Sequence, residues 1–549
     1  MTKFNSADKH SAFRVVDKRS SVEPSPLVTT DAMSKTFEGA PGYLRDAKSE
    51  LFLLATTSLD LFGVDAFYES ASERTQRFIE LVKEVAPADP HWMGDFLIWL
   101  RGPGNLRTVA VVGSVHASLA MIEADIVGSR TIINQVCQRA DEPGEVLAYA
   151  RRVAGGRVPA PVKRGVADAA QRLYSEFSLL KYDTPSHAYR FGDVIDIVHP
   201  TAVDAGQSRL FRYALDRRHN RPDPHDEYLD MVRRNTALRV EAAAGIFDGL
   251  LDPAVLGSAG MTWEDSLSLA GSKVDKRELW KALLPSMGFM AVLRNLRNFD
   301  QAGLTDEEVS RATVILQNPV AVQQSRQLPM RFLTAYRNVP SLRWSYPLEK
   351  ALELSLSNIP ELPGRTLVLI DTSGSMDSPF SPVNSWQRPR SVEEPDPLMR
   401  WDAAAMFGLA LARRCETADV VSFSSESKPF HLRAGASLLS EISRFQGGYF
   451  LNAGTDTVGA LSQHYAGHNR VVILTDEQDG WYFGGNSITV SSAMPQDKML
   501  WTFNLAGYGV AQVKSSPTRV TIGGLTDHMF RLIPQVESAR DGWPWEIGE

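Results

Sequence analysis

Cysteine is scarce in this chain of 549 residues, which contains only Cys137 and Cys415. The two are far apart in the sequence. A disulfide framework and a thiolate zinc site both need more cysteines at closer spacing, so neither is expected. The composition suits a reducing compartment.

Long apolar runs are also missing. The first thirty residues are polar and mixed in charge, without the apolar segment of a signal peptide. The stretch LFLLATTSLDLFGV (51–64) is too short to span a bilayer and contains Asp60. We therefore expect a soluble cytoplasmic protein that has no membrane partner.

Familiar catalytic motifs are absent as well. The sequence has no phosphate-binding P-loop, no H-E-x-x-H pair and no nucleophile elbow. The glycine-bearing stretch GPGNLRTV (102–109) lacks the spacing of a dinucleotide-binding loop. We expect a protein that binds and does not catalyse.

Charge is distributed unevenly around a net value of −7. Residues 361–549 hold 15 Lys or Arg against 21 Asp or Glu, whereas the rest of the chain is near neutral. Within that rest, residues 150–190 hold eight basic residues against three acidic, and residues 309–350 hold six against one. Such patches bind phosphates even on an acidic protein. The alternative is an ordinary solvated helix face.

The length implies two or more domains. Residues 1–34 are polar, contain Pro24 and Pro26, and are predicted to be a disordered leader. Residues 35–360 read almost wholly as amphipathic helices separated by short breaks. Many successive helices without strands predict an α-solenoid of stacked helical pairs.

The pattern changes after NIPELPGR (358–365), so residues 361–549 are predicted to be a separate domain. Apolar strands are predicted at 366–370, 418–424, 470–476 and 497–507, and helices at 400–415 and 457–465. This alternation is typical of a doubly wound parallel sheet, in which ligands lie at the carboxyl ends of the strands.

Oxygen-bearing side chains gather at those predicted strand ends. DTSGS follows the first strand, the loop NAGTDT precedes a helix, and an aspartate ends the strand RVVILTD. Two carboxylates with three hydroxyls suit a hard cation, Mg²⁺ or another divalent ion. The alternative is an aspartate that caps a helix beside turn-forming serines. The candidate metal ligands are Asp371, Ser373, Ser375, Thr455 and Asp476.

These three motifs, in this order, resemble the metal-ion-dependent adhesion site of von Willebrand factor A domains. The resemblance covers about residues 363–540 and implies the α/β doubly wound fold of that family. The Pro-rich segment SPFSPVNSWQRPRSVEEPDPLMR (378–400) departs from it as an insertion directly after the metal loop.

The helical part resembles the TROVE module of Ro autoantigen proteins, as does the order of the two domains. The resemblance is carried by TFEGAPGYLRDAKSELFLLA (36–55), LWKALLPSMGFMAVLRNLRNF (279–299) and SRQLPMRFLTAYRNV (325–339). It implies HEAT-like helical pairs closed into a ring. It also implies binding of small structured Y-like RNA on the outer surface and of single-stranded ends of misfolded RNAs in the ring, and a ribonuclease as a candidate partner. No DNA is expected.

The resemblance also indicates candidate RNA-binding residues. Lys163, Arg164 and His187 match positions that contact Y RNA in the family, although a packing role remains an alternative for His187. Trp344 and Tyr346 are aromatic residues that either stack on bases or belong to the core. The candidates for the ring interior are Arg294, Asn295, Arg297, Arg326, Arg331 and Arg337.

Two other functions remain open at this point. The first is a metal-dependent protein-interaction scaffold that uses the A domain and binds no RNA. The second is a metal-dependent nuclease, which is less favoured because a single-metal site rich in hydroxyls suits ligand capture better than hydrolysis.

Overall fold

The computed structural model divides by internal contacts into two compact units, which are described separately. One contains the described residues of Val82–Ala312, and the other contains those up to Leu81 and from Thr313 onward. This division differs from the predicted boundary at residue 360, since the last helices before the sheet belong to the unit of the sheet. None of the described helices has the length and apolarity needed to cross a membrane. The described residues are 29–35, 41–57, 71–221, 228–339, 341–379, 398–476, 490–505, 518–523, 529–538 and 543–546.

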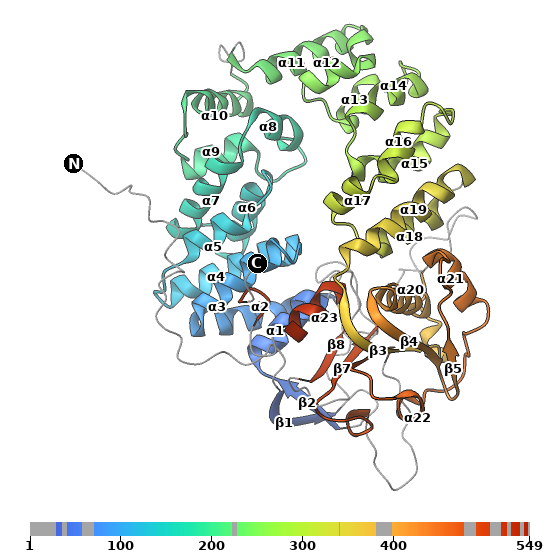
Figure 1. The fold of residues 1–549 in the computed structure, drawn as a ribbon. Helices are drawn as coiled ribbons and strands as arrows, with labels where there is room; N and C mark the ends of the chain where they lie inside the picture. The colour runs from blue at the N-terminus through green and yellow to red at the C-terminus, as the bar shows by residue number, and fades with distance from the viewer. Residues whose placement is uncertain are drawn as a thin grey trace. The chain divides into compact units, whose positions relative to one another are not determined.

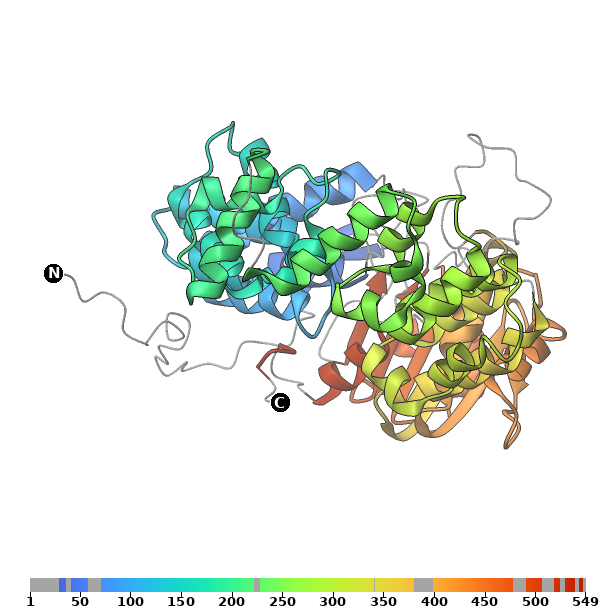
Figure 2. The same cartoon turned by 90° about the horizontal axis from the view of Figure 1, so that it is seen from above.

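The first unit is helical throughout its described residues. Neighbouring helices pack side by side, α4 against α5 and α5 against α7, as the light-blue to teal segments of Figure 1 show, and Figure 2 gives the same helices in a view from above. This confirms the prediction of many stacked helices. The helices of this unit include α3 (Pro90–Arg101), α4 (Arg107–Glu123), α5 (Ser129–Val136), α6 (Glu142–Val153), α7 (Ala160–Leu173), α8 (Glu176–Tyr182), α9 (Phe191–Val198), α10 (Ala205–Arg218), α11 (Asp230–Ala243), α13 (Trp263–Ala270), α14 (Lys276–Leu283) and α15 (Phe289–Gln301).

Local sequence explains where many of these helices begin. The Asp89 side chain accepts a hydrogen bond from the amide of Trp92, and Pro90 follows at the first helical position of α3. Ser175 begins α8 with a reciprocal capping box. Helix α15 then shows why the helices stack, because Leu296 and Phe299 lie on its buried face.

The second unit contains a six-stranded mixed sheet in the order β5-β4-β3-β6-β7-β8. Its strands pair in parallel except β5, which pairs antiparallel with β4. The strands are β3 (Leu362–Asp371), β4 (Cys415–Phe423), β5 (Ser427–Phe430), β6 (Arg470–Thr475), β7 (Met499–Asn504) and β8 (Arg519–Gly523), and the helices are α1 (Ala47–Thr57), α17 (Pro319–Ser325), α18 (Pro329–Asn338), α19 (Ser345–Ser355), α20 (Arg400–Ala412), α21 (Leu438–Gln446), α22 (Thr457–His464) and α23 (Met529–Ser538).

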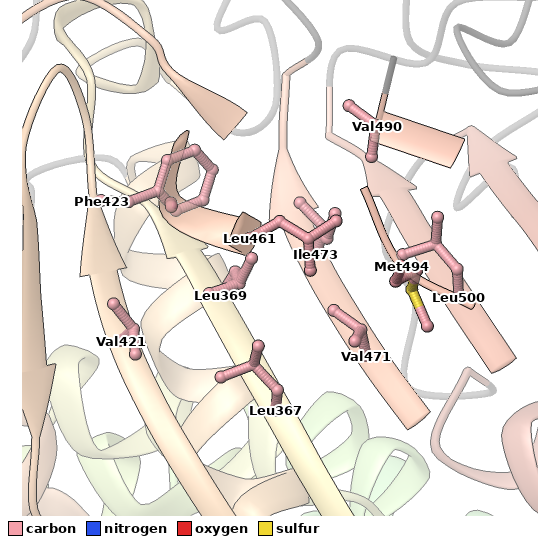
Figure 3. Close-up of a cluster of buried hydrophobic side chains, with 11 residues drawn as sticks. Leu367, Leu369, Val421, Phe423, Leu461, Val471, Ile473, Val490, Met494 and Leu500 are labelled. Atoms are coloured by element: carbon pink, nitrogen blue, oxygen red, sulfur yellow. The ribbon is translucent and has the colours of Figure 1, made fainter. Parts of the chain in front are cut away.

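Both faces of this sheet are covered. Figure 3 shows one face, where side chains of neighbouring strands such as Leu369, Val421 and Ile473 meet Leu461 of α22. Helix α20 packs against β3 and β4. Every residue of β6 is buried, as expected for a central parallel strand.

Gly408 lets α20 approach the sheet closely. A Cβ atom at this position would lie 2.8 Å from Cδ1 of Ile370 and 3.0 Å from Cδ1 of Leu474. Any larger residue would overpack this contact. The close approach packs the part of α20 around Gly408 against β3 and β6, at the residues that directly precede Asp371 and Thr475.

Several elements were not predicted. Residues 29–34, expected in the disordered leader, lie in β1 (Thr29–Lys35), which pairs antiparallel with β2 (Pro41–Arg45). That part of the leader prediction is therefore wrong, because pairing with a nearby strand overrides a polar composition. Residues 1–28 lie outside the described residues. The short strands β5 and β8 and the helices α21 and α23 were also missed.

Candidate functional site

Asp371 is the last residue of β3, and the parallel register with β6 places it beside Thr475. The Thr475 hydroxyl donates a hydrogen bond of 2.6 Å to Oδ2 of Asp371. The amide of Ser373 donates one of 2.8 Å to Oδ1. Both carboxylate oxygens are thereby fixed in direction within a buried environment.

The two serines connect Asp371 to the end of the neighbouring strand. The hydroxyls of Ser373 and Ser375 lie 3.2 Å apart, and Ser375 donates to Oδ1 of Asp476 at 3.0 Å. Asp476 follows β6 directly and is fully buried. Four of the five predicted ligands are therefore joined by hydrogen bonds around one point at the carboxyl edge of the sheet.

The loop that contains Thr455 is bound to the same edge. The amide of Asn452 donates to the Thr372 carbonyl at 2.8 Å, and the amide of Gly374 donates to the Ala453 carbonyl at 3.0 Å. Thr455 is half-buried in this loop, two residues after Ala453. The structure thus places the loop of the fifth predicted ligand against the loop of the first three.

Burial raises the pKa of the Asp371 carboxyl to about 7, and the negative charge of Asp476 acts in the same direction. Hydrogen bonds from Thr475 and Ser373 lower that pKa and offset only part of the rise. A buried carboxyl beside a second carboxylate is stabilised as an anion by a nearby cation. The site is therefore electrostatically suited to a positive charge.

The donor set fits a hard divalent cation in part. Two carboxylates and neighbouring hydroxyls are the oxygen ligands that Mg²⁺ accepts, with water completing the shell. Nowhere among the described residues do three His, Cys, Asp or Glu side chains come together in a metal-binding group. An ion at this edge would consequently depend on the hydroxyls as well as on Asp371 and Asp476.

One charged residue of this site, Arg400, was not predicted from the sequence. Its Nη1 donates to Oδ2 of Asp476 at 3.0 Å, and the Arg400 residue is only 5% exposed. The amide of Arg400 donates to the Ser378 carbonyl at 2.9 Å, which joins the start of α20 to the metal loop. No sequence signal indicated this pair, since Arg400 looks like the first residue of an ordinary helix.

The candidate Y RNA residues lie on the first unit. Lys163 is half-buried and Arg164 exposed, both near the start of α7. Positive charge near a helix N-terminus opposes the helix dipole, so helix stability does not explain these residues. By contrast, Arg172 near the end of α7 hydrogen-bonds to the carbonyls of Asn134 and Cys137 and is structural.

His187 lines an open cavity of about 500 Å³ between α4, α6 and the loop before α9. Arg152 lies over the ring of Tyr149 in that cavity, 4.9 Å from its centroid, and Tyr189 accepts a hydrogen bond from Arg151. Arginines and aromatic rings in one hollow are suited to phosphate and base contacts. Of the residues that line this cavity, the sequence indicated only His187, because the others come from separate segments of the chain.

The residues predicted from α15 separate into two kinds. Arg294 and Arg297 are exposed. Asn295 is only 1% exposed, donates to the Ala291 carbonyl at 2.8 Å, and accepts from Asn298 at 2.7 Å. The prediction that Asn295 contacts RNA is therefore contradicted, since its amide is enclosed within the packed face of the helix.

The arginines predicted near α18 also differ. Arg326 and Arg331 are exposed. Arg337 pairs with Asp402 of α20 at 3.4 Å and is half-buried, so it joins two helices of the second unit. Trp344 is a core residue at 1% exposed, whereas Tyr346 is 65% exposed.

Comparison with known proteins finds a domain family that matches part of the chain. Residues 258–346 match the TROVE domain. The telomerase protein component 1 of Mus musculus is 37% identical over 83 residues, and that of Rattus norvegicus is 36% identical over 83 residues. In both cases the match covers 15% of this chain and only 3% of the relative's length.

The fold of this chain is similar to that of a solved structure over most of its length. The crystal structure of the Deinococcus radiodurans RO (RSR) protein is similar with a TM-score of 0.63 at 18% sequence identity, covering 90% of this chain and 99% of that one. At this identity the likeness concerns the fold, and the TROVE match concerns the sequence. Residues 258–346 thus match the TROVE domain in sequence, and the chain is similar in fold to a Ro protein.

Proposed function

We propose that this chain binds small structured noncoding RNA of the Y type through α7 and the cavity at His187. The TROVE and Ro relationship implies RNA binding in general. The observation that carries the finer proposal is the cavity itself, where His187, Arg152 and Tyr149 lie together. Helix α7, with its exposed Arg164, packs against α6, which contributes Tyr149 and Arg152.

The chemistry of this surface suits RNA. Guanidinium groups bind phosphate and stack on bases, and a tyrosine ring offers a face on which an unpaired base packs. These contacts tolerate different sequences, so they favour recognition of RNA shape.

We also propose that the chain binds the single-stranded ends of misfolded RNAs. Arg294, Arg297, Arg326 and Arg331 are exposed and suited to contacts with one strand. A ribonuclease bound alongside would make the protein a scaffold for RNA processing, with no catalysis by this chain itself.

The test is RNA affinity as a function of salt. If about five phosphates are neutralised, log K should fall with log salt at a slope of about −3.5, or roughly a hundredfold between 50 and 200 mM. Lys163→Glu combined with Arg164→Glu should weaken binding of a structured hairpin more than binding of a short single strand. A flat salt response would overturn the proposal, and equal effects on both RNAs would show that α7 is not the structured-RNA surface.

A second candidate is capture of a protein ligand through a divalent cation, with Mg²⁺ as the ion expected. The observation that favours it is the chain of hydrogen bonds at the sheet edge that runs from Asp371 through Ser373 and Ser375 to Asp476. A partner carboxylate would complete the coordination of such an ion. A partner that binds in Mg²⁺ and is released by EDTA, while RNA affinity is unchanged, would support this candidate.

A further inference from the structure

A buried arginine already supplies positive charge at the candidate metal centre. Arg400 donates to Oδ2 of Asp476, while Ser375 donates to Oδ1 of the same carboxylate. The side chains of Arg400 and Asp476 are 6% and 0% exposed. Both oxygens of Asp476 are therefore engaged by groups of this chain.

A guanidinium and a divalent cation exclude one another at this carboxylate. The guanidinium keeps its charge at all ordinary pH values and carries no acceptor for a metal. Two positive charges a few ångströms apart in a buried site repel strongly. Direct coordination by Asp476 Oδ2 consequently requires Arg400 to withdraw.

We propose that Arg400 is a built-in competitor of the divalent cation, which balances Asp476 in the absence of metal and must leave when the ion binds. Arg400 begins α20 and its backbone amide donates to the Ser378 carbonyl, so the guanidinium that must move belongs to the residue that joins α20 to the metal loop. The inference rests on the metal centre named above and is independent of RNA binding.

The experiment measures Mg²⁺ and Mn²⁺ affinity of the full chain by titration calorimetry. Arg400→Gln removes the charge and keeps a hydrogen-bond donor, and Arg400→Lys keeps the charge. Arg400→Gln should bind about tenfold or more tightly than the wild type, and Arg400→Lys should stay near the wild type. Equal or weaker binding by Arg400→Gln would overturn the competition and make Arg400 a residue that positions Asp476.

Thermal unfolding provides a second readout, which also shows whether the variants fold. Without metal, Arg400→Gln should melt below the wild type, because Asp371 and Asp476 lose their compensating charge. Added Mg²⁺ should raise its Tm by more than it raises that of the wild type.

The matched control is Arg413→Gln, at the other end of α20. Arg413 pairs with Glu353 at 2.9 Å, away from the cluster of oxygens, so its loss should lower Tm equally with and without Mg²⁺. Equal Mg²⁺ shifts in Arg400→Gln and Arg413→Gln would overturn the proposal. Absence of metal binding in both the wild type and Arg400→Gln would overturn the metal centre together with the competition, and leave the RNA proposal standing.

Discussion

His116, in α4, shows how a single buried side chain couples stability to pH. Its Nε2 lies 2.8 Å from the Tyr149 hydroxyl, and its buried Nδ1 has no hydrogen-bond partner among the described residues. Burial, and then the positive charge of Lys83, lower the pKa of His116 to about 4. Because the folded protein holds the neutral ring, the contribution of His116 to the free energy of unfolding is fully present above about pH 6.5. This contribution should be lost as the pH falls through 4.

The measurement is the free energy of unfolding by urea between pH 7 and pH 4. His116→Gln should flatten the pH dependence in this window, since glutamine does not titrate. His91→Gln, at an exposed position of α3, is the matched control and should leave the dependence unchanged. Identical curves for the wild type and His116→Gln would contradict the prediction.

Asp371 is the residue on which the proposed metal centre depends most. Asp371→Asn keeps an acceptor for Thr475 but removes the charge, so Mg²⁺ binding in titration calorimetry should be lost while the fold is retained. Asp377→Asn, an exposed position near the same loop, should bind Mg²⁺ as the wild type does. Unchanged binding by Asp371→Asn would show that the metal ligands are misassigned.

At the scale of elements, α18 contains two arginines in different environments. Arg337 pairs with Asp402 of α20, whereas Arg331 is exposed. Arg337→Ala should lower the free energy of unfolding by about 1 kcal/mol, because it removes the ion-pair partner of a largely buried carboxylate, which keeps only its neutral donors, the Gln446 side chain and the Met399 amide. Arg331→Ala should leave unfolding unchanged and weaken binding of single-stranded RNA.

Each variant is the control of the other, because both remove an arginine from one helix. Urea unfolding and fluorescence anisotropy with a short single strand would be measured in parallel. If Arg337→Ala weakened RNA binding more than Arg331→Ala without loss of stability, the structural role of Arg337 would be refuted.

At the scale of the whole molecule, the ring that the Ro resemblance implies leads to a prediction about RNA shape. An opening lined by arginines that admits one strand excludes an A-form duplex, so a free single-stranded end becomes the selected feature. A hairpin with a single-stranded 3′ tail should bind more tightly than the same blunt hairpin, and a tail of different sequence should bind about equally. Arg331→Glu should remove the advantage of the tail. Equal affinities for tailed and blunt hairpins at fixed salt would exclude selection by an opening.

The sequence by itself determined the features that depend on neighbouring residues. Amphipathic periodicity indicated the helices, and apolar runs indicated β3, β4, β6 and β7. Parallel strands share one carboxyl edge, so Asp371 and Asp476 could be placed together without coordinates. The short strand β5 carried too weak a local signal to be found.

Only the tertiary structure decided which polar side chains are engaged inside the protein. Arg400 reaches Asp476 across 76 residues, and Arg337 reaches Asp402 across 65. Likewise, Asn295 is enclosed by packing, and the cavity at His187 takes its lining from several helices. The sequence does not distinguish an exposed arginine from a buried, paired one. Desolvation and ion pairing depend on distances through space between segments that are far apart in the chain, and no local sequence pattern records those distances.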